Sequence, residues 1–401
     1  MKKMHLIVWA SLLLLVPVQA FAQPKASNQI PVRDAVPTSE IFRTKPYLQR
    51  PIGDEITICW ETNVPVVSWV EYGKNGKLDQ KKMLYADGQM ICNNTRHHFR
   101  LSGLIPGETY SYRVCSQEIT LYEPYKKEFG NTAVSDVYTF TLPEKDETDF
   151  TVLLFNDLHS NFSTMDSFAN IIKEQQIGYD FVIFNGDCID DVNREERAIE
   201  VLSHLNELAD ASNKPFFFLR GNHEIRGAYS IEMRQLFDYI DQTTYGAFSW
   251  GDTRFVTLDC GEDKPDSTWV YYNLNDFSRF RLDQASFLAD ELASREFKEA
   301  RRHVLVHHIP IYGALEKGYY TPCYDLWNPL LRDAPFDICF NAHWHRFTYY
   351  PKGEVGNNFP VILGGGPKPE IAYMLILQKK GEQLTFRAVG ADGKEKLKLE
   401  L

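Results

Sequence analysis

FTVLLFNDLH, at residues 150–159, joins a short apolar strand to the polar sequence Asn156-Asp157-Leu158-His159. The same arrangement, an apolar strand followed by Asp, Asn or His, recurs four times further along the chain. Its polar segments are Asn185-Gly186-Asp187, Arg220-Gly221-Asn222-His223-Glu224, His307-His308-Ile309-Pro310 and Asn341-Ala342-His343-Trp344-His345. Fully apolar strands are typical of sheets covered on both faces, and such sheets bind ligands outside the carboxyl ends of their strands. We therefore predict that five strand ends meet at one site.

Around this stretch, apolar strands alternate with amphipathic helices. The predicted strands are residues 150–155, 181–184, 215–219, 255–258, 304–306, 336–340 and 361–363. The predicted helices are residues 168–176, 195–209 and 284–300. This alternation indicates a layered α/β domain, which we expect to span residues 149–401.

The segment before it has a different pattern, in which short alternating runs are separated by turn residues. The predicted strands are residues 55–60, 66–72, 97–101, 110–115 and 137–142. We expect a β-sandwich over residues 43–143, a linker over residues 23–42, and a short charged linker before the α/β domain. The turn Leu104-Ile105-Pro106-Gly107, which leads into Tyr110-Ser111-Tyr112, resembles the tyrosine corner of fibronectin type III domains.

Residues 1–22 have the pattern of a secretory signal peptide. Lys2 and Lys3 precede an apolar run over residues 6–18, which ends in Ala20-Phe21-Ala22. We expect cleavage after Ala22 and an exported protein, periplasmic or secreted. An uncleaved membrane anchor is the alternative, although the apolar run is short for a membrane span.

The composition of the 401 residues excludes some functions. A formal net charge of −11 disfavours general binding to nucleic acids or to anionic membrane surfaces. Seven cysteines without any Cys-x-x-Cys spacing disfavour a structural zinc site. Cys92 and Cys115 are close enough in sequence to consider as a disulfide of the first domain.

The polar residues at the five strand ends have the chemistry of metal ligands. Carboxylates, imidazoles and a side-chain amide suit hard or borderline divalent cations. In extended segments residues i and i+2 point the same way, so Asp157 with His159, or His343 with His345, can hold one ion together or divide between neighbouring ions. Asp187 has two carboxylate oxygens and could bridge two ions.

The complete set resembles that of calcineurin-like metallophosphoesterases. The matching residues are Asp157-x-His159, Gly186-Asp187, Gly221-Asn222-His223-Glu224, His308-x-Pro310 and His343-x-His345. The β-rich front segment is similar to that of purple acid phosphatases, which belong to the same superfamily. The resemblance implies an N-terminal β-sandwich followed by a four-layer α/β/β/α catalytic domain with a dinuclear metal centre.

The resemblance also assigns roles to individual residues. It implies one metal held by Asp157, His159 and His345, a second held by Asn222, His308 and His343, and a bridge formed by Asp187. The family spacing His-x-Pro selects His308 over its neighbour His307, which is then a supporting or structural residue. The implied catalytic residues are Asp187 and His223, with His223 as proton donor.

Two positions depart from this pattern. Purple acid phosphatases have a metal-binding Tyr three residues after the bridging Asp, where this chain has Asp190. The tyrosinate colour should therefore be absent, and the two ions could be iron, manganese or zinc, divalent or mixed-valent. Ala342 replaces a common Gly before His-x-His, which is acceptable if its φ is negative.

The expected function is hydrolysis of small phosphate esters. In the hypothesis a hydroxide held by the metals attacks phosphorus, and His223 gives a proton to the leaving oxygen; the alternative is that His223 only orients its neighbours. We expect a phosphomonoesterase of the acid phosphatase type, without nucleic-acid partners or membrane insertion after signal cleavage. The alternatives are a phosphodiesterase or nucleotidase with the same centre, or a non-catalytic binding protein. The oligomeric state is unknown.

Overall fold

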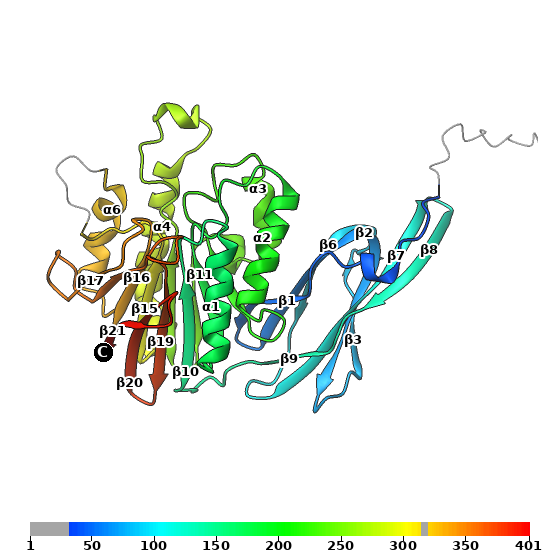
Figure 1. Cartoon of the computed structure of the whole chain (residues 1–401), viewed down its shortest axis with the longest axis horizontal. Helices are drawn as coiled ribbons and strands as arrows, with labels where there is room; N and C mark the ends of the chain where they lie inside the picture. The colour runs from blue at the N-terminus through cyan, green and yellow to red at the C-terminus, as the bar shows by residue number, and fades with distance from the viewer. Residues whose placement is uncertain (1–31, 314–319) are drawn as a thin grey trace, which may run out of the picture.

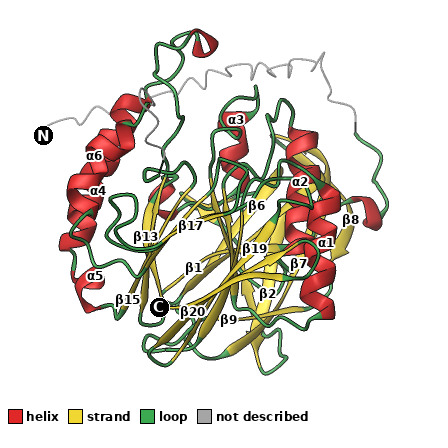
Figure 2. Cartoon of the chain, turned by 60° about the vertical axis from the view of Figure 1, so that its left-hand side comes forward, coloured by secondary structure: helices red, strands yellow, loops and turns green. Residues whose placement is uncertain are grey.

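The computed structural model describes residues 32–313 and 320–401 (Figure 1). The predicted signal peptide lies outside the described residues. Two large sheets are present in this part of the chain, and helices flank them on both sides (Figure 2). No described helix has both the length and the apolar character needed to span a membrane.

The first sheet of the α/β region has the order β21-β20-β19-β10-β11-β12. Its strands are β10 (Phe150–Phe155), β11 (Phe181–Asn185), β12 (Phe216–Leu219), β19 (Tyr373–Lys380), β20 (Gln383–Gly390) and β21 (Glu395–Glu400). β10, β11 and β12 are parallel, whereas β19 runs antiparallel to β10. The three parallel strands therefore present their carboxyl ends at one edge.

The second sheet has the order β13-β14-β15-β16-β18-β17. Its strands are β13 (Gly246–Trp250), β14 (Thr253–Leu258), β15 (Arg302–His307), β16 (Ile338–Asn341), β17 (Thr348–Tyr350) and β18 (Val361–Leu363). β14, β15, β16 and β18 are parallel to their neighbours in this order.

Helices cover the outer face of each sheet. They are α1 (Phe162–Glu174), α2 (Glu195–Leu208), α3 (Ser230–Met233), α4 (Phe277–Ala293), α5 (Arg295–Glu299) and α6 (Pro322–Leu331). Short 3-10 helices are η1 (Thr38–Glu40), η2 (Arg234–Leu236), η3 (Ile240–Gln242) and η4 (Trp269–Tyr271). Figure 2 shows α1 and α2 on one side of the strands, and α4, α5 and α6 on the other.

Alternation along the central strands builds three apolar layers. In β10, Leu153 and Phe155 pack in the cluster that contains α1 and α2, whereas Val152 and Leu154 pack between the two sheets. A third cluster lies between the second sheet and α6. This confirms the predicted four-layer α/β/β/α fold with a β-rich region before it, because both faces of each sheet are covered.

The N-terminal region is built from strands that continue the first sheet. They are β1 (Tyr47–Ile52), β2 (Glu55–Lys74), β3 (Gln80–Lys82), β6 (Asn94–Leu101), β7 (Thr109–Glu123), β8 (Lys126–Val134) and β9 (Tyr138–Thr141). β4 (Tyr85–Ala86) and β5 (Gln89–Met90) form a separate pair. β1 pairs in parallel with β12 through Gln49 and Phe216, so the β-rich region and the α/β region share one thirteen-stranded sheet.

Two of the predicted N-terminal strands are a single long strand, β2. Its first half pairs with β6 and its second half with β7, with a register shift between Glu61 and Val66. Apolar residues from both halves pack in one core with Trp60 at 0% exposure. The predicted tyrosine corner forms, because the hydroxyl of Tyr110 accepts a hydrogen bond of 3.0 Å from the Ile105 amide.

The described end of the expected linker packs on this region. The Arg33 amide donates to the Thr120 carbonyl, and the side chain of Ile41 is fully buried. All seven cysteines are free thiols, so the considered pair of Cys92 and Cys115 does not form.

Candidate metal centre

The carboxyl ends of β10, β11, β12, β15 and β16 meet at one edge of the α/β region. The residues that follow them form three groups of closely placed ligand atoms: Asp157 with His159 and His345, Asp187 with His308 and His343, and His159 with Asp190 and His223. The chain therefore brings together side chains from five separated segments, as the sequence predicts.

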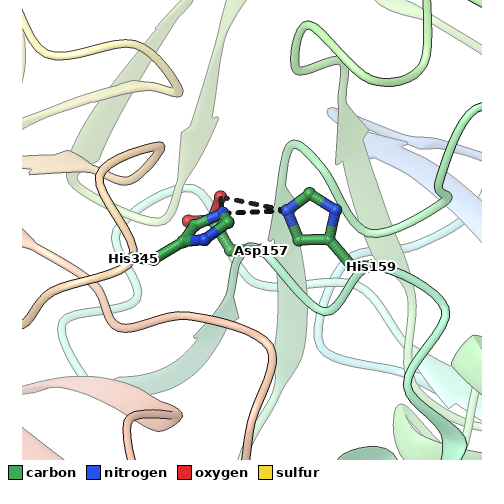
Figure 3. Close-up of side chains that lie close together, drawn as sticks. All are labelled: Asp157, His159 and His345. Atoms are coloured by element: carbon green, nitrogen blue, oxygen red, sulfur yellow. Dashed lines mark hydrogen bonds and ion pairs between the residues drawn. The ribbon is translucent and has the colours of Figure 1, made fainter.

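In the first group, three ligand atoms from two segments point toward one another (Figure 3). Nε2 of His345 lies 3.3 Å from Oδ1 of Asp157 and 3.0 Å from Nε2 of His159. Nε2 of His159 lies 3.7 Å from the same carboxylate oxygen. These three atoms lie close enough to share one cation.

The second group is more deeply buried. Nε2 of His308 lies 3.0 Å from Oδ2 of Asp187, and both side chains are 1% exposed. The same oxygen of Asp187 lies 3.8 Å from Nε2 of His159 in the first group. Asp187 therefore stands between these two groups, which is the position required for a bridging ligand.

Several buried ligand atoms have no hydrogen-bond partner among the described residues. They are Oδ1 of Asp157, Oδ1 of Asn222 and Nε2 of His308. A buried acceptor without a partner costs about 1–3 kcal/mol, so such atoms are rare unless a ligand satisfies them. These oxygen and nitrogen donors fit divalent cations, and the ligand assignment stays a prediction.

Hydrogen bonds orient the ligands so that these atoms stay free. The amide of Asn156 and the backbone N–H of His343 both donate to Oδ2 of Asp157, at 2.8 and 2.9 Å, which leaves Oδ1 available. Nδ1 of His308 donates to the Asn185 carbonyl at 2.8 Å, which directs Nε2 toward Asp187. Such supporting contacts fix the tautomer and orientation of metal-binding histidines.

Backbone strain is concentrated at the same residues. Five of the predicted ligands have positive φ angles; they are Asp157, His159, Asp187, His343 and His345. Left-handed backbone costs of order 1–3 kcal/mol per non-glycine residue and persists where function or packing requires it. Ala342 is not among the positive-φ residues, so its methyl group is tolerated as predicted.

The carboxylates make the site strongly attractive to positive charge. Burial alone lowers the pKa of His308, but Asp187 and Asp157 raise it to about 10. His159 is likewise desolvated, yet the same two carboxylates raise its pKa to about 9. A buried place that stabilises positive charge to this extent is suited to cations.

His223 lies beside the first two groups. It contacts Asp190, the acid that stands where purple acid phosphatases have a metal-binding Tyr. Nδ1 of His223 lies 2.6 Å from Oδ1 of Asp190, and Nδ1 of His159 lies 3.3 Å from the same oxygen. Asp190 therefore orients both imidazoles and leaves Nε2 of each ring facing the site. Because Asp190 follows Asp187 closely in sequence, it is expected near the site. Only the loop conformation shows that it contacts the rings of His159 and His223.

Glu224 holds the loop that carries Asp187. Its carboxylate accepts four backbone N–H groups, from Asp187, Cys188, Ile189 and Gly221, at 2.8–2.9 Å. The glycines are required here, because a Cβ at Gly221 would lie 2.3 Å from Oδ1 of Asp187. The motif Gly-Asn-His-Glu contains Glu224, but its spacing says nothing of this role.

Three further side chains, those of His307, Arg220 and Arg226, are close in sequence to the predicted ligands. His307 is fully buried, its Nδ1 lies 2.9 Å from the Ile309 carbonyl, and burial lowers its pKa to about 4, so it is structural. Arg220 pairs with Asp259 at 2.9 Å. Arg226 pairs with Glu262 at 3.0 Å, and its Nη1 also lies 3.2 Å from Nε2 of His223.

One further acid, Asp263, was not anticipated. Asp263 is on the loop that follows β14, and its Oδ2 lies 3.1 Å from Nε2 of His343. This contact leaves Nδ1 of His343 as the ring nitrogen available to the second group.

Comparison with known proteins agrees with this geometry. Residues 150–347 match the sequence model of the calcineurin-like phosphoesterase family. A purple acid phosphatase from yellow lupin (Lupinus luteus) seeds has a similar fold, with a TM-score of 0.67 and 15% identity over 88% of this chain and 73% of that chain. The structure of PhoD is similar with a TM-score of 0.62 and 13% identity over 90% and 89%. A search of curated protein sequences found no match.

Proposed function

Since residues 150–347 form a calcineurin-like phosphoesterase domain, which makes the chain a metal-dependent hydrolase of phosphate esters, we propose that it is an exported phosphomonoesterase. Export is inferred from the signal-peptide pattern of residues 1–22 and implies a periplasmic or secreted enzyme. The observation that carries the choice of monoesters is the position of Arg226 beside His223.

Two metal ions supply Lewis-acid polarisation and lower the pKa of water when they are bound. Asp157, His159 and His345 would hold one ion; Asn222, His308 and His343 would hold the other, with Asp187 between them. The family uses a dinuclear centre of this kind, and iron, manganese and zinc all suit these donors.

His223 is placed to move a proton. Its Nδ1 lies 2.6 Å from Oδ1 of Asp190, and its Nε2 accepts a hydrogen bond from Nη1 of Arg226 at 3.2 Å. A phosphate group that binds here competes for the guanidinium and releases Nε2. Nε2 then takes up a proton from solvent and gives it to the leaving oxygen, a step that contributes about 10²–10⁴-fold in enzymes.

Arg226 also favours a monoester over a diester. A monoester dianion has one more negative charge than a diester, and a guanidinium next to the centre stabilises that extra charge. Glu262 accepts from Nε and Nη2 of Arg226, whereas Nη1 of Arg226 is directed at His223.

The test uses the chain from residue 23 onward, with bound metals measured by mass spectrometry. We expect two ions per chain, and a higher kcat/KM for an aryl monoester than for the diester with the same aryl group. Arg226→Gln should lower the monoester value by about tenfold and the diester value by less. Faster diester cleavage, with Arg226→Gln affecting both equally, would support the phosphodiesterase alternative. A chain that holds two metals and cleaves neither ester would support the binding-protein alternative.

A further inference from the structure

A pocket of 1140 Å³ lies between α3 and the loop that joins β14 to α4. In Figures 1 and 2 this loop, residues 259–276, rises at the same end of the molecule as α3. The lining residues come from residues 220–234, 242–245 and 264–280. None of the predicted metal ligands is among them, so the pocket is a separate space.

The pocket nevertheless adjoins the metal centre through two basic side chains. Arg226 lines the pocket and places Nη1 3.2 Å from Nε2 of His223. Lys264 also lines it and pairs with Asp263, whose Oδ2 lies 3.1 Å from Nε2 of His343. A phosphate ester bound at the centre would therefore have this pocket within reach of its alcohol portion.

Apolar and aromatic side chains form part of the pocket walls. Four lining side chains are largely exposed: Ile231 at 68%, Val270 at 42%, Tyr272 at 73% and Leu274 at 88%. Contiguous exposed apolar side chains mark binding sites, because water contact with them is unfavourable. Their position on both α3 and the loop means that a ligand between the two walls would cover them.

Three of the four basic side chains that line the pocket have acidic partners; Arg234 has none among the described residues, and the lining contains one acid, Asp276. Asp259 pairs with Arg220, Glu262 with Arg226, and Glu262 and Asp263 with Lys264. Such a site gives little advantage to an alcohol portion that carries further phosphates. It favours an apolar body, and the contact of Arg220 with the ring of Phe280, at 5.6 Å, adds another flat surface.

Three lining residues also have unused hydrogen-bonding groups. Both side-chain amide atoms of Asn275, the hydroxyl of Tyr271 and Nε of Arg234 are buried without a partner in the described chain. Apolar pockets that bind small molecules typically contain a few such groups, which fix the orientation of the ligand.

We propose that this space, the leaving-group pocket, binds the alcohol portion of the substrate. The preferred substrates are then phosphate esters of bulky apolar or aromatic alcohols that carry a hydrogen-bond acceptor. This inference rests on the proposed function, and it names the substrate class of the same centre.

The test compares two aryl monoesters whose alcohols have equal pKa values, one with a single ring and one with a biphenyl body. The protein is the manganese-loaded chain from residue 23 onward. Leu274→Asp and Ile231→Asp change opposite walls of the pocket at exposed positions. Leu282→Asp is the matched control, since Leu282 is 53% exposed on α4 and does not line the pocket.

We expect the biphenyl ester to have the higher kcat/KM. Each pocket variant should lower that value about tenfold and the single-ring value less than twofold. Leu282→Asp should change neither. Equal rates for the two esters, or equal losses in the pocket variants and the control, would overturn the inference and leave the proposed function intact.

A binding measurement separates the two claims. Calorimetry with the free biphenyl alcohol and metal-free protein should show binding that Leu274→Asp weakens and Leu282→Asp retains. Such binding without hydrolysis of any ester would support the pocket and contradict the proposed function. No binding of the alcohol to the wild-type chain would overturn the pocket, whatever the hydrolysis assay shows.

Discussion

The candidate metal centre and a second cluster of charged side chains lie in the same molecule and differ in the partners of their carboxylates. The second cluster, here the junction cluster, connects the β-rich region to the α/β region; it consists of Arg43, Glu61, Arg96, Glu195 and Tyr229. Its carboxylates already have cationic partners, with Arg96 2.9 Å from Glu61 and 2.8 Å from Glu195. The carboxylates of the metal centre have no Lys or Arg partner among the described residues.

Backbone conformation separates the two clusters as well. No member of the junction cluster has a positive φ angle, whereas Asp157, His159 and Asp187 do. Buried charge alone therefore does not identify a functional site. Unpartnered acceptors together with backbone strain do, because stability alone would not retain either.

The largest effect should follow a change at the bridging position. Asp187→Asn keeps the shape of the side chain and removes the charge that two cations would share. We expect kcat/KM to fall by at least about a thousandfold and the metal content to drop below two per chain. The metal-free variant should remain folded and unfold cooperatively in urea with a chelator, although it loses the charged contact with His308. A variant that does not fold would place Asp187 with the junction cluster, as a structural residue.

His223 tests whether the residues beside the centre do chemistry. His223→Ala should lower kcat about 10²–10³-fold for an alkyl phosphate, whose leaving oxygen needs a proton. The loss should be less than about tenfold for para-nitrophenyl phosphate, whose leaving group needs none. Asp190→Asn should also affect the alkyl phosphate more than para-nitrophenyl phosphate. Both losses should be smaller than in His223→Ala, because only the partner of Nδ1 is removed. Equal losses for both substrates would assign His223 the orienting role.

Local signals explain which parts of the fold could be predicted from the sequence. β10 has the predicted bounds, Phe150–Phe155. A mainly apolar run followed by polar residues can be recognised within ten residues of sequence. The parallel pairing of β1 with β12 was missed, since it joins Gln49 to Phe216 and no local pattern records that contact. The strands β19, β20 and β21 were also missed.

In the candidate site, too, some features follow from local sequence and others do not. The predicted ligands are close together because parallel strands place their carboxyl ends at one edge. The roles of Asp190, Glu224 and Asp263 depend on the loops between elements, where a few dihedral angles decide which atoms meet. The ligand assignment remains a prediction, and metal analysis of the single-residue variants tests it.

A change in the junction cluster should affect stability and leave the chemistry intact. Arg96→Ala removes the partner of Glu61, whose side chain is 1% exposed. We expect the free energy of unfolding to fall by about 2 kcal/mol, measured in urea, while kcat/KM changes less than twofold. The double variant Arg96→Met with Glu61→Met is the control, because it removes both charges and should recover most of the loss. A large fall in kcat/KM without loss of stability would connect the junction cluster to the centre.

The smallest effect concerns the protonation of Glu61. Burial raises its pKa from 4.5 to about 7, against the opposing effect of Arg96, so the folded protein binds this proton more tightly than the unfolded chain. The contribution of this group to stability is therefore complete below pH 4.5 and is lost as the pH rises through about 7.

Unfolding of the wild type and of Glu61→Gln, measured from pH 4.5 to 8, checks this dependence. The free energy of unfolding of the wild type minus that of Glu61→Gln should fall by about 1–2 kcal/mol as the pH rises over this range. Taking the difference cancels the titration of the metal centre, which both proteins share. A constant difference would mean that Glu61 stays ionised beside Arg96 throughout. The expected slope would instead show that Glu61 takes up a proton although Arg96 lies beside it, so burial outweighs the ion pair at this position.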